Sequence, residues 1–108
     1  MEIQSEHNRG WSEIWLRIAR AGVVTVEQRW EEIPEVFGEA ADGLERAGAR
    51  VLRTWLLREW AEAHLLRGEP EDVERAKVLF SEALSEYKEM GATGHVERVR
   101  ARLDEIEN

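Results

Sequence analysis

The sequence predicts an all-α protein in which antiparallel helical hairpins stack as a short α-solenoid of about five helices. The first observation is an internal repeat in which the same residue types return 43 positions later: Phe37, Glu39, Ala40, Gly48 and Ala49 recur as Phe80, Glu82, Ala83, Gly91 and Ala92. The second is that apolar residues return at spacings of 3 and 4 along the chain, which is the period of an α-helix. A repeat of two helices cannot bury its own apolar face, so successive copies are expected to stack.

Size and composition fit one folded domain covering residues 1–108. The chain has 43% hydrophobic and 35% charged residues and a net charge of −8. Such an acidic balance argues against nucleic acid or an anionic membrane as a partner, because both require a basic surface. No cysteine is present, which excludes disulfides and thiolate chemistry. No apolar run approaches the ~20 residues of a membrane span, and the first residues do not resemble a signal peptide. We therefore expect a cytoplasmic protein.

The first helix is predicted from its apolar spacing. Residues 1–9 are polar and are expected to be frayed. Four apolar residues then fall on one helical face, at spacings of 3, 1 and 3: Trp11, Ile14, Trp15 and Ile18. Gly22 is well placed to end this helix.

The second helix raises the question of a proline. Residues 25–28 have the form of a capping box, Thr-x-x-Gln. A single apolar stripe follows at alternating spacings of 4 and 3: Val26, Trp30, Ile33, Phe37, Ala40, Leu44 and Ala47. Pro34 interrupts it, and proline inside a helix costs ~3 kcal/mol. The unbroken stripe favours one kinked helix; the alternative is that Pro34 begins a separate helix.

The remaining three helices have clear ends. Residues 50–67 form a helix whose apolar residues cover a wide arc, so we expect it to be the most buried, with neighbours on both sides. Gly68 ends it and Pro70 begins the next, which runs to Met90. A capping helix over about 94–107 has an apolar face and a charged one. The expected organisation is repeat one at about 10–48, repeat two at about 49–91, and this cap.

Residues 57–87 resemble a tetratricopeptide repeat. Ala61 and His64 occupy the small and aromatic positions of the first helix, and Ala76, Phe80 and Ala83 occupy the alanine–aromatic–alanine positions of the second. The segments 68–76 and 84–92 look like the C-terminal helical arrays of bacterial LuxR-type activators and cyclase-linked ATPases. The chain departs from the family in its period of 43 rather than 34 residues, in His64 where tyrosine is usual, and in Ile33-Pro34 where an alanine is expected.

The residues point to no catalytic chemistry, cofactor or metal, and we do not expect an enzyme. The histidines are His7, His64 and His95, and neither His64 nor His95 has a second ligand three or four residues away. His64 is interpreted as a packed core residue. An acidic row is interpreted as a solvated face, with docking of a basic partner as the alternative: Glu27, Glu31, Glu35, Glu39 and Asp42.

The resemblance also implies a partner-binding surface. The family's groove positions correspond here to seven residues on the first, third and fifth helices: Leu16, Arg20, Trp55, Arg58, Glu62, Leu65 and Arg98. A tryptophan among arginines is a typical anchor of a binding surface. The alternative for Trp55 is that it covers a neighbouring helix.

Trp11 and Trp15 predict self-association, because a terminal helix of a solenoid normally has a polar outer face. Alternatively, the chain is a piece of a longer array in which another repeat covers them. The predicted function is therefore a non-catalytic module that binds a protein or peptide on its concave face or forms a homodimer. Two alternatives remain: a small-ligand sensor with a pocket lined by Trp55, Trp60 and His64, and a dimerisation segment of a larger signalling ATPase.

Overall fold

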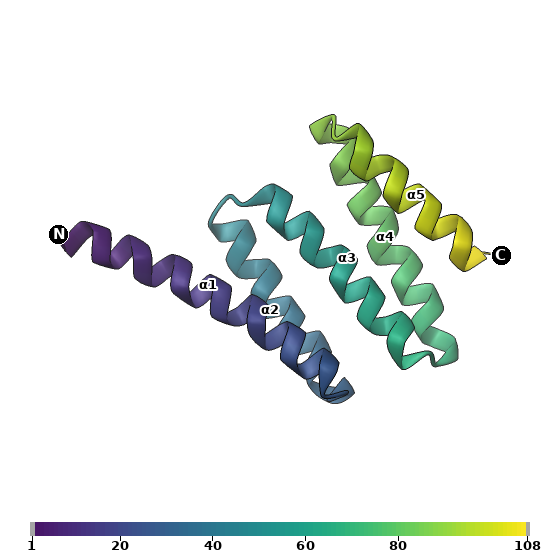
Figure 1. Cartoon of the computed structure of the whole chain (residues 1–108), viewed down its shortest axis with the longest axis horizontal. Coiled ribbons are helices and arrows are strands. Elements are labelled where there is room, and N and C mark those ends of the chain that lie inside the picture. Colours follow the sequence, from purple (N-terminus) through teal and green to yellow (C-terminus); the bar gives the residue numbers. More distant parts are fainter. Residues whose placement is uncertain (1, 108) are drawn as a thin grey trace. The chain divides into compact units, whose positions relative to one another are not determined.

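A computed structural model describes residues 2–107, and the side chains of residues 11–107. Every regular element in this range is helical, as the sequence predicted, and the chain forms two compact units, Met1–Ala49 and Arg50–Asn108 (Figure 1). The elements are α1 (Glu2–Val26), a 3-10 turn η1 (Trp30–Glu32), α2 (Ile33–Arg46), α3 (Arg50–Arg67), α4 (Pro70–Met90) and α5 (Thr93–Glu107). Helix α1 thus includes residues 2–9, where the sequence suggested a frayed end.

The first unit is a hairpin in which α1 packs against α2. Ala21 and Val24 are the buried apolar residues of α1 within the described range. Helix α2 contributes a wider set: Ile33, Val36, Phe37, Ala40, Ala41 and Leu44. The helices approach closely at Gly43, where a Cβ atom would lie 3.1 Å from Nη1 of Arg17. The missing side chain of Gly43 therefore leaves room for the guanidinium.

The predicted end of the first helix at Gly22 is wrong. Helix α1 continues to Val26, and the hydroxyl of Thr25 donates to the carbonyl of Ala21 rather than capping a new helix. Gly22 is exposed, and mid-helix glycine costs only about 1 kcal/mol, which burial of Ala21 and Val24 can offset. The turn that follows the helix contains Gln28, whose φ of 58° is left-handed.

The predicted kinked helix through Pro34 is also wrong. Helix α2 begins at Ile33, and Pro34 lies in its first turn, where an N–H would have no partner within the helix. The apolar stripe is correspondingly broken: Val26 is 80% exposed and Ala47 is exposed. Trp30, predicted to be a core residue, is half-buried in η1.

The second unit has α4 packed against both α3 and α5. The bounds of α3 and α4 match the prediction, and α5 begins at Thr93. The core of the second unit is one cluster of buried residues from all three helices: Leu57, Ala61, Ala76, Phe80, Ala83, Tyr87, Val96 and Val99. Helix α4 has its main packing partners on both sides within this unit, and α3 contacts α4 by packing and α5 through side-chain pairs.

Helices α2 and α4 end in the same way. Gly48 and Gly91 have φ values of 71° and 70°. The following alanines, Ala49 and Ala92, each donate a backbone hydrogen bond of 2.9 Å to the carbonyl five residues earlier. These acceptors, Leu44 and Tyr87, are 0% exposed. The two helix ends, 43 residues apart, therefore share the same type of cap and a buried acceptor residue. No helix within the described residues has both the length and the apolarity that crossing a membrane requires.

Candidate interaction surface

Helix α1 has a second apolar face, opposite to the one it buries. Trp15, Ala19, Val23 and Val26 follow one another at spacings of 4, 4 and 3 residues, and Leu16 lies beside them. Trp15 is 52% exposed, Leu16 69%, Val23 48% and Val26 80%. We call these five residues the outer α1 face. Because Ala21 and Val24 occupy the opposite side of the helix, α1 is apolar both inside and outside.

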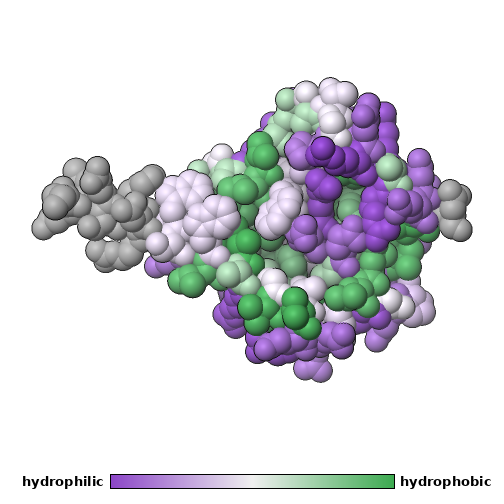
Figure 2. All heavy atoms as spheres, in the orientation of Figure 1, coloured by the Kyte–Doolittle hydropathy of each residue, from purple (hydrophilic) through white to green (hydrophobic). Residues whose placement is uncertain are grey.

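The outer α1 face contains no charged residue. The other residues on the same side of the helix between positions 12 and 26 are Ser12 and Gly22, which are also uncharged. Charge appears only at its edge, where Glu13 and Arg20 are exposed. Beyond the grey residues, apolar and near-neutral side chains reach the surface along α1 (Figure 2). A contiguous apolar surface with a polar rim is the usual form of a protein interaction site.

The predicted self-association residues lie in different environments. Trp15 is on the outer α1 face, whereas Trp11 is half-buried and already makes a contact within the structure. Of the predicted groove residues on α1, Leu16 belongs to the outer α1 face and Arg20 to its edge.

The predicted groove residues of the second unit do not form one open surface. Trp55 is 37% exposed, Arg98 is exposed, and Leu65 is half-buried against the core of the unit. The other two, Arg58 and Glu62, already contact α5.

Arg58 lies beside an aromatic pair. The rings of Tyr87 and His95 stack with centroids 4.6 Å apart and an angle of 13° between their planes. The guanidinium carbon of Arg58 lies 5.9 Å from the centre of the Tyr87 ring, and Nη1 is 3.5 Å from Nδ1 of His95. Arginine can only donate, so this contact favours the His95 form in which Nδ1 is an acceptor. Arg58 therefore joins α3 to both α4 and α5.

Glu62 forms a two-pronged ion pair with Arg102 across α3 and α5. Arg102 donates from Nε and Nη2 to the two oxygens of Glu62, at 2.9 and 2.8 Å, and from Nη1 to Glu105 at 2.9 Å. The hydrogen bond to Glu62 raises the pKa of the Arg102 guanidinium. Arg102 belongs to the charged face of the capping helix, which the sequence distinguishes from its apolar face. It is half-buried because its charge is matched by Glu62.

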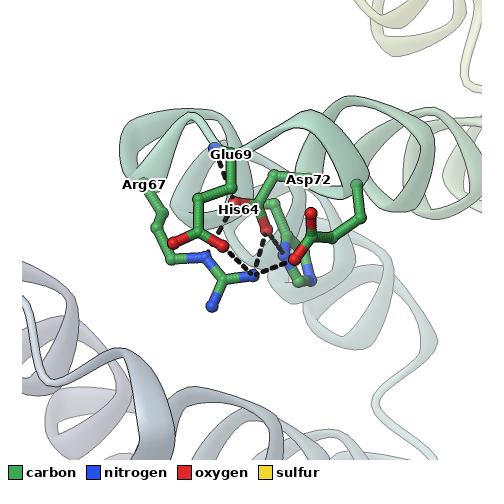
Figure 3. Close-up of polar contacts among 5 residues, drawn as sticks. His64, Arg67, Glu69 and Asp72 are labelled. Carbon is green, nitrogen blue, oxygen red and sulfur yellow. Dashed lines mark hydrogen bonds and ion pairs between the residues drawn. The ribbon is translucent and has the colours of Figure 1, made fainter.

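A buried charge cluster joins the end of α3 to the start of α4 (Figure 3). Asp72 is 0% exposed and accepts four hydrogen bonds. Arg67 donates from Nε to Oδ2 at 2.7 Å and from Nη2 to Oδ1 at 2.9 Å. Nδ1 of His64 donates to Oδ1 at 2.8 Å, and the backbone N–H of Glu69 donates to Oδ2 at 3.0 Å. The last bond completes a capping box between Glu69 and Asp72.

The four donors decide the chemistry of Asp72. Hydrogen bonding from Arg67 holds the pKa of this carboxyl well below its ordinary value, and the bonds from His64 and Glu69 act in the same direction against the effect of burial. A carboxylate has about four lone-pair sites, so all of them are occupied here. The ionised group orients His64 and fixes the angle between α3 and α4. His64 is indeed buried, as predicted, and Asp72 is the partner that sequence reasoning missed; its position three residues after Glu69 at a helix start was the available signal.

Other predicted features are located as follows. The acidic residues of the solvated row are all exposed. Arg50, at the start of α3, pairs with Glu86 and Glu89 of α4. A hollow of about 290 Å³ is lined by the turn residues 28–32, and none of Trp55, Trp60 and His64 lines it. Among the described residues, no three histidine, aspartate or glutamate side chains are arranged to hold a metal ion.

Sequence reasoning did not recognise Val23 and Val26 as part of the outer α1 face. It ended the first helix at Gly22, so Val23 and Val26 were assigned to a loop and to the next stripe. The run Val23–Val26 contains no glycine or proline, which was a signal that the helix continues. Comparison with known proteins adds no further assignment, because no family model, curated protein or solved structure matches this chain.

Proposed function

We propose that this protein is a non-catalytic interaction module of tetratricopeptide-like helical repeats, which binds a protein partner through the outer α1 face. The carrying observation is the exposure of Trp15, Leu16, Val23 and Val26 on one uncharged side of a helix. Leaving such a face in water forgoes ~25 cal/mol for every Å² of apolar area, and large exposed apolar patches mark interaction sites. The resemblance to bacterial regulators leads us to place the module in the cytoplasm of a bacterium.

The second unit supports the repeat proposal. In a stacked helical repeat, the first helix of one hairpin lies beside the first helix of the next. Here α3 and α5 contact each other through Arg58 and His95 and through Glu62 and Arg102, while α4 packs against both. The equivalent caps at Gly48 and Gly91 support the same reading.

The polar clusters support a structural rather than a catalytic role. General acid–base catalysis needs a group that can exchange a proton with a substrate. The His64–Asp72 pair is enclosed by Arg67 and Glu69, so Asp72 has no free acceptor position. Glu62 and Arg58 likewise hold α5 in place, which is why we assign partner binding to α1 rather than to the α3–α5 side.

The proposal is tested by photo-crosslinking in cells. A photoreactive amino acid at position 16 should give a covalent adduct with a protein, whereas the same group at position 78 should not. Leu16 and Val78 are both 69% exposed, which makes the two positions a matched pair. Absence of an adduct from position 16, and from position 23, would refute binding through this face.

A further inference from the structure

We propose that the outer α1 face binds a second copy of this chain, with α1 packed antiparallel against α1 about a two-fold axis near residues 16 and 17. This inference rests on the proposed function and names the partner. It is carried by the charges at the edge of the face, by the sizes of its side chains and by the distribution of charge over the chain.

The edge charges are complementary to themselves in one orientation only. Glu13 and Arg20 are exposed, seven residues apart, and therefore on the same edge of the helix two turns from each other. In an antiparallel pair centred between residues 16 and 17, Glu13 of each copy lies opposite Arg20 of the other. A parallel two-fold pair would instead place this edge against the other edge of the partner's face, where the uncharged Trp11 and Gly22 lie, and Glu13 and Arg20 would have no partner of opposite charge there. Charge therefore selects both the orientation and the register.

The side-chain sizes fit the same register. With the axis between residues 16 and 17, the large side chain of Trp15 comes level with position 18 of the partner, one residue or about 1.5 Å from the small Ala19. Gly22 comes level with Trp11 of the other copy, and a Cβ atom at Gly22 would meet nothing within 4 Å. The two Leu16 side chains meet at the centre. Large residues thus face small ones on both sides of the axis, as two closely packed helices require.

The distribution of charge removes the main objection to self-pairing. The chain carries −8, so two copies repel each other in general. Residues 11–26 contain one acid, Glu13, and two bases, Arg17 and Arg20, which gives +1. The net charge of this stretch therefore opposes the approach of a second copy far less than the net charge of the whole chain would suggest. Helix α1 spans Glu2–Val26, so the two copies overlap along the helix from residue 7 to residue 26, a length of about 30 Å. One helix from each copy gives an interface at the small end of the specific range, so the dimer should depend on concentration.

Sedimentation equilibrium of the full chain from about 10 μM to 1 mM tests the inference. The wild-type mass should rise from monomer towards dimer. The variant Trp15→Glu/Leu16→Glu should weaken dimerisation at least tenfold, and a charge-matched control, Val51→Glu/Val78→Glu, should leave it unchanged. The control residues are 58% and 69% exposed, so neither variant removes a buried contact.

A charge exchange tests the geometry. Glu13→Arg and Arg20→Glu should each weaken the dimer about threefold or more, because each places like charges opposite each other. The double variant Glu13→Arg/Arg20→Glu should restore it, with circular dichroism confirming that all variants are folded. A failure of rescue would overturn the antiparallel register. A wild-type chain that stays monomeric at 1 mM, while position 16 crosslinks to a different protein, would overturn self-pairing and leave the proposed function intact; absence of any adduct would refute both.

Discussion

At the scale of single residues, Asp72 shows how a full charge can be stabilised at a position that is 0% exposed. Burial alone would favour the neutral acid. The four donors from Arg67, His64 and Glu69 reverse that preference and lower the pKa. Because Asp72 lies in the first turn of α4, the positive end of the helix dipole also favours the ionised form.

Replacing Asp72 should therefore cost stability in a pH-dependent way. We expect Asp72→Asn to lower the free energy of unfolding by about 2–4 kcal/mol at pH 7. The pKa is lower in the folded state than in the unfolded state, where it is about 3.9. The stabilisation is therefore complete above about pH 5, begins to decrease as the pH passes the unfolded value near 4, and is lost completely only when the pH has also fallen through the lower folded pKa. Urea unfolding at pH 7 and pH 3 measures the effect: the gap between wild type and variant should shrink at pH 3.

The control for Asp72 is Asp104→Asn on the exposed surface of α5. We expect it to change the free energy of unfolding by less than about 0.5 kcal/mol. A gap between wild type and Asp72→Asn that is equal at both pH values would show that the carboxylate is not stabilised by its ionisation.

Gln28 is the second residue with a special environment. Its φ of 58° lies in the left-handed region, and Arg29 donates past it to the carbonyl of Val24 at 2.9 Å, which is the pattern of a helix that ends with glycine. Gln28→Gly should raise the free energy of unfolding by about 0.5–1 kcal/mol. Gln28→Val should lower it by a similar amount or more, because a β-branched side chain fits this region worst. Equal stabilities of the two variants, measured by urea unfolding, would contradict this account of the turn.

At the scale of helices, the ends that need a residue with positive φ could be predicted from glycine. The ends that depend on a balance between helix propensity and burial of neighbouring side chains could not. Gly48, Gly68 and Gly91 all have positive φ and all end helices as expected. Gly22 has no such role, so burial of Ala21 and Val24 on either side of it carried α1 onward. The apolar stripe through Pro34 led to the wrong prediction of one kinked helix. Apolar residues on the two sides of a short turn can have the spacing of a single helix by sequence alone.

Pro34 gives a test at this scale. Because it lies in the first turn of α2, Pro34→Ala restores an N–H that has no partner within the helix. We expect the free energy of unfolding to fall by less than about 1 kcal/mol, through the greater freedom of the unfolded chain. If one helix ran through this position, the same change would instead stabilise the protein by about 3 kcal/mol. Urea unfolding distinguishes a small loss from a large gain.

At the scale of the whole molecule, the helical class could be predicted because it depends on apolar spacings that recur many times along the chain. The site was predicted less well, because it depends on which residues find partners. Arg58 and Glu62 have the composition of a binding surface, yet their charges are used within the second unit. Trp15 was named because an apolar outer face on a terminal helix is visible in the sequence itself, and Leu16 because the family resemblance implies a groove position there. An ion pair between residues 40 positions apart, such as Glu62 with Arg102, leaves no local pattern.

The two compact units should also differ in whether they fold alone. The fragment 50–108 contains a core fed by three helices, together with the Asp72 cluster and the pair of Glu62 with Arg102. The fragment 1–49 is a single helical hairpin, in which each helix packs against one other helix only. Helices in proteins gain most of their stability from packing, so this hairpin has little to stabilise it. We expect fragment 50–108 to show a helical circular dichroism spectrum and a cooperative thermal transition, and fragment 1–49 to be largely unfolded under the same conditions. If 50–108 melts without cooperativity, the boundary between Ala49 and Arg50 separates two groups of contacts but does not separate two folding units.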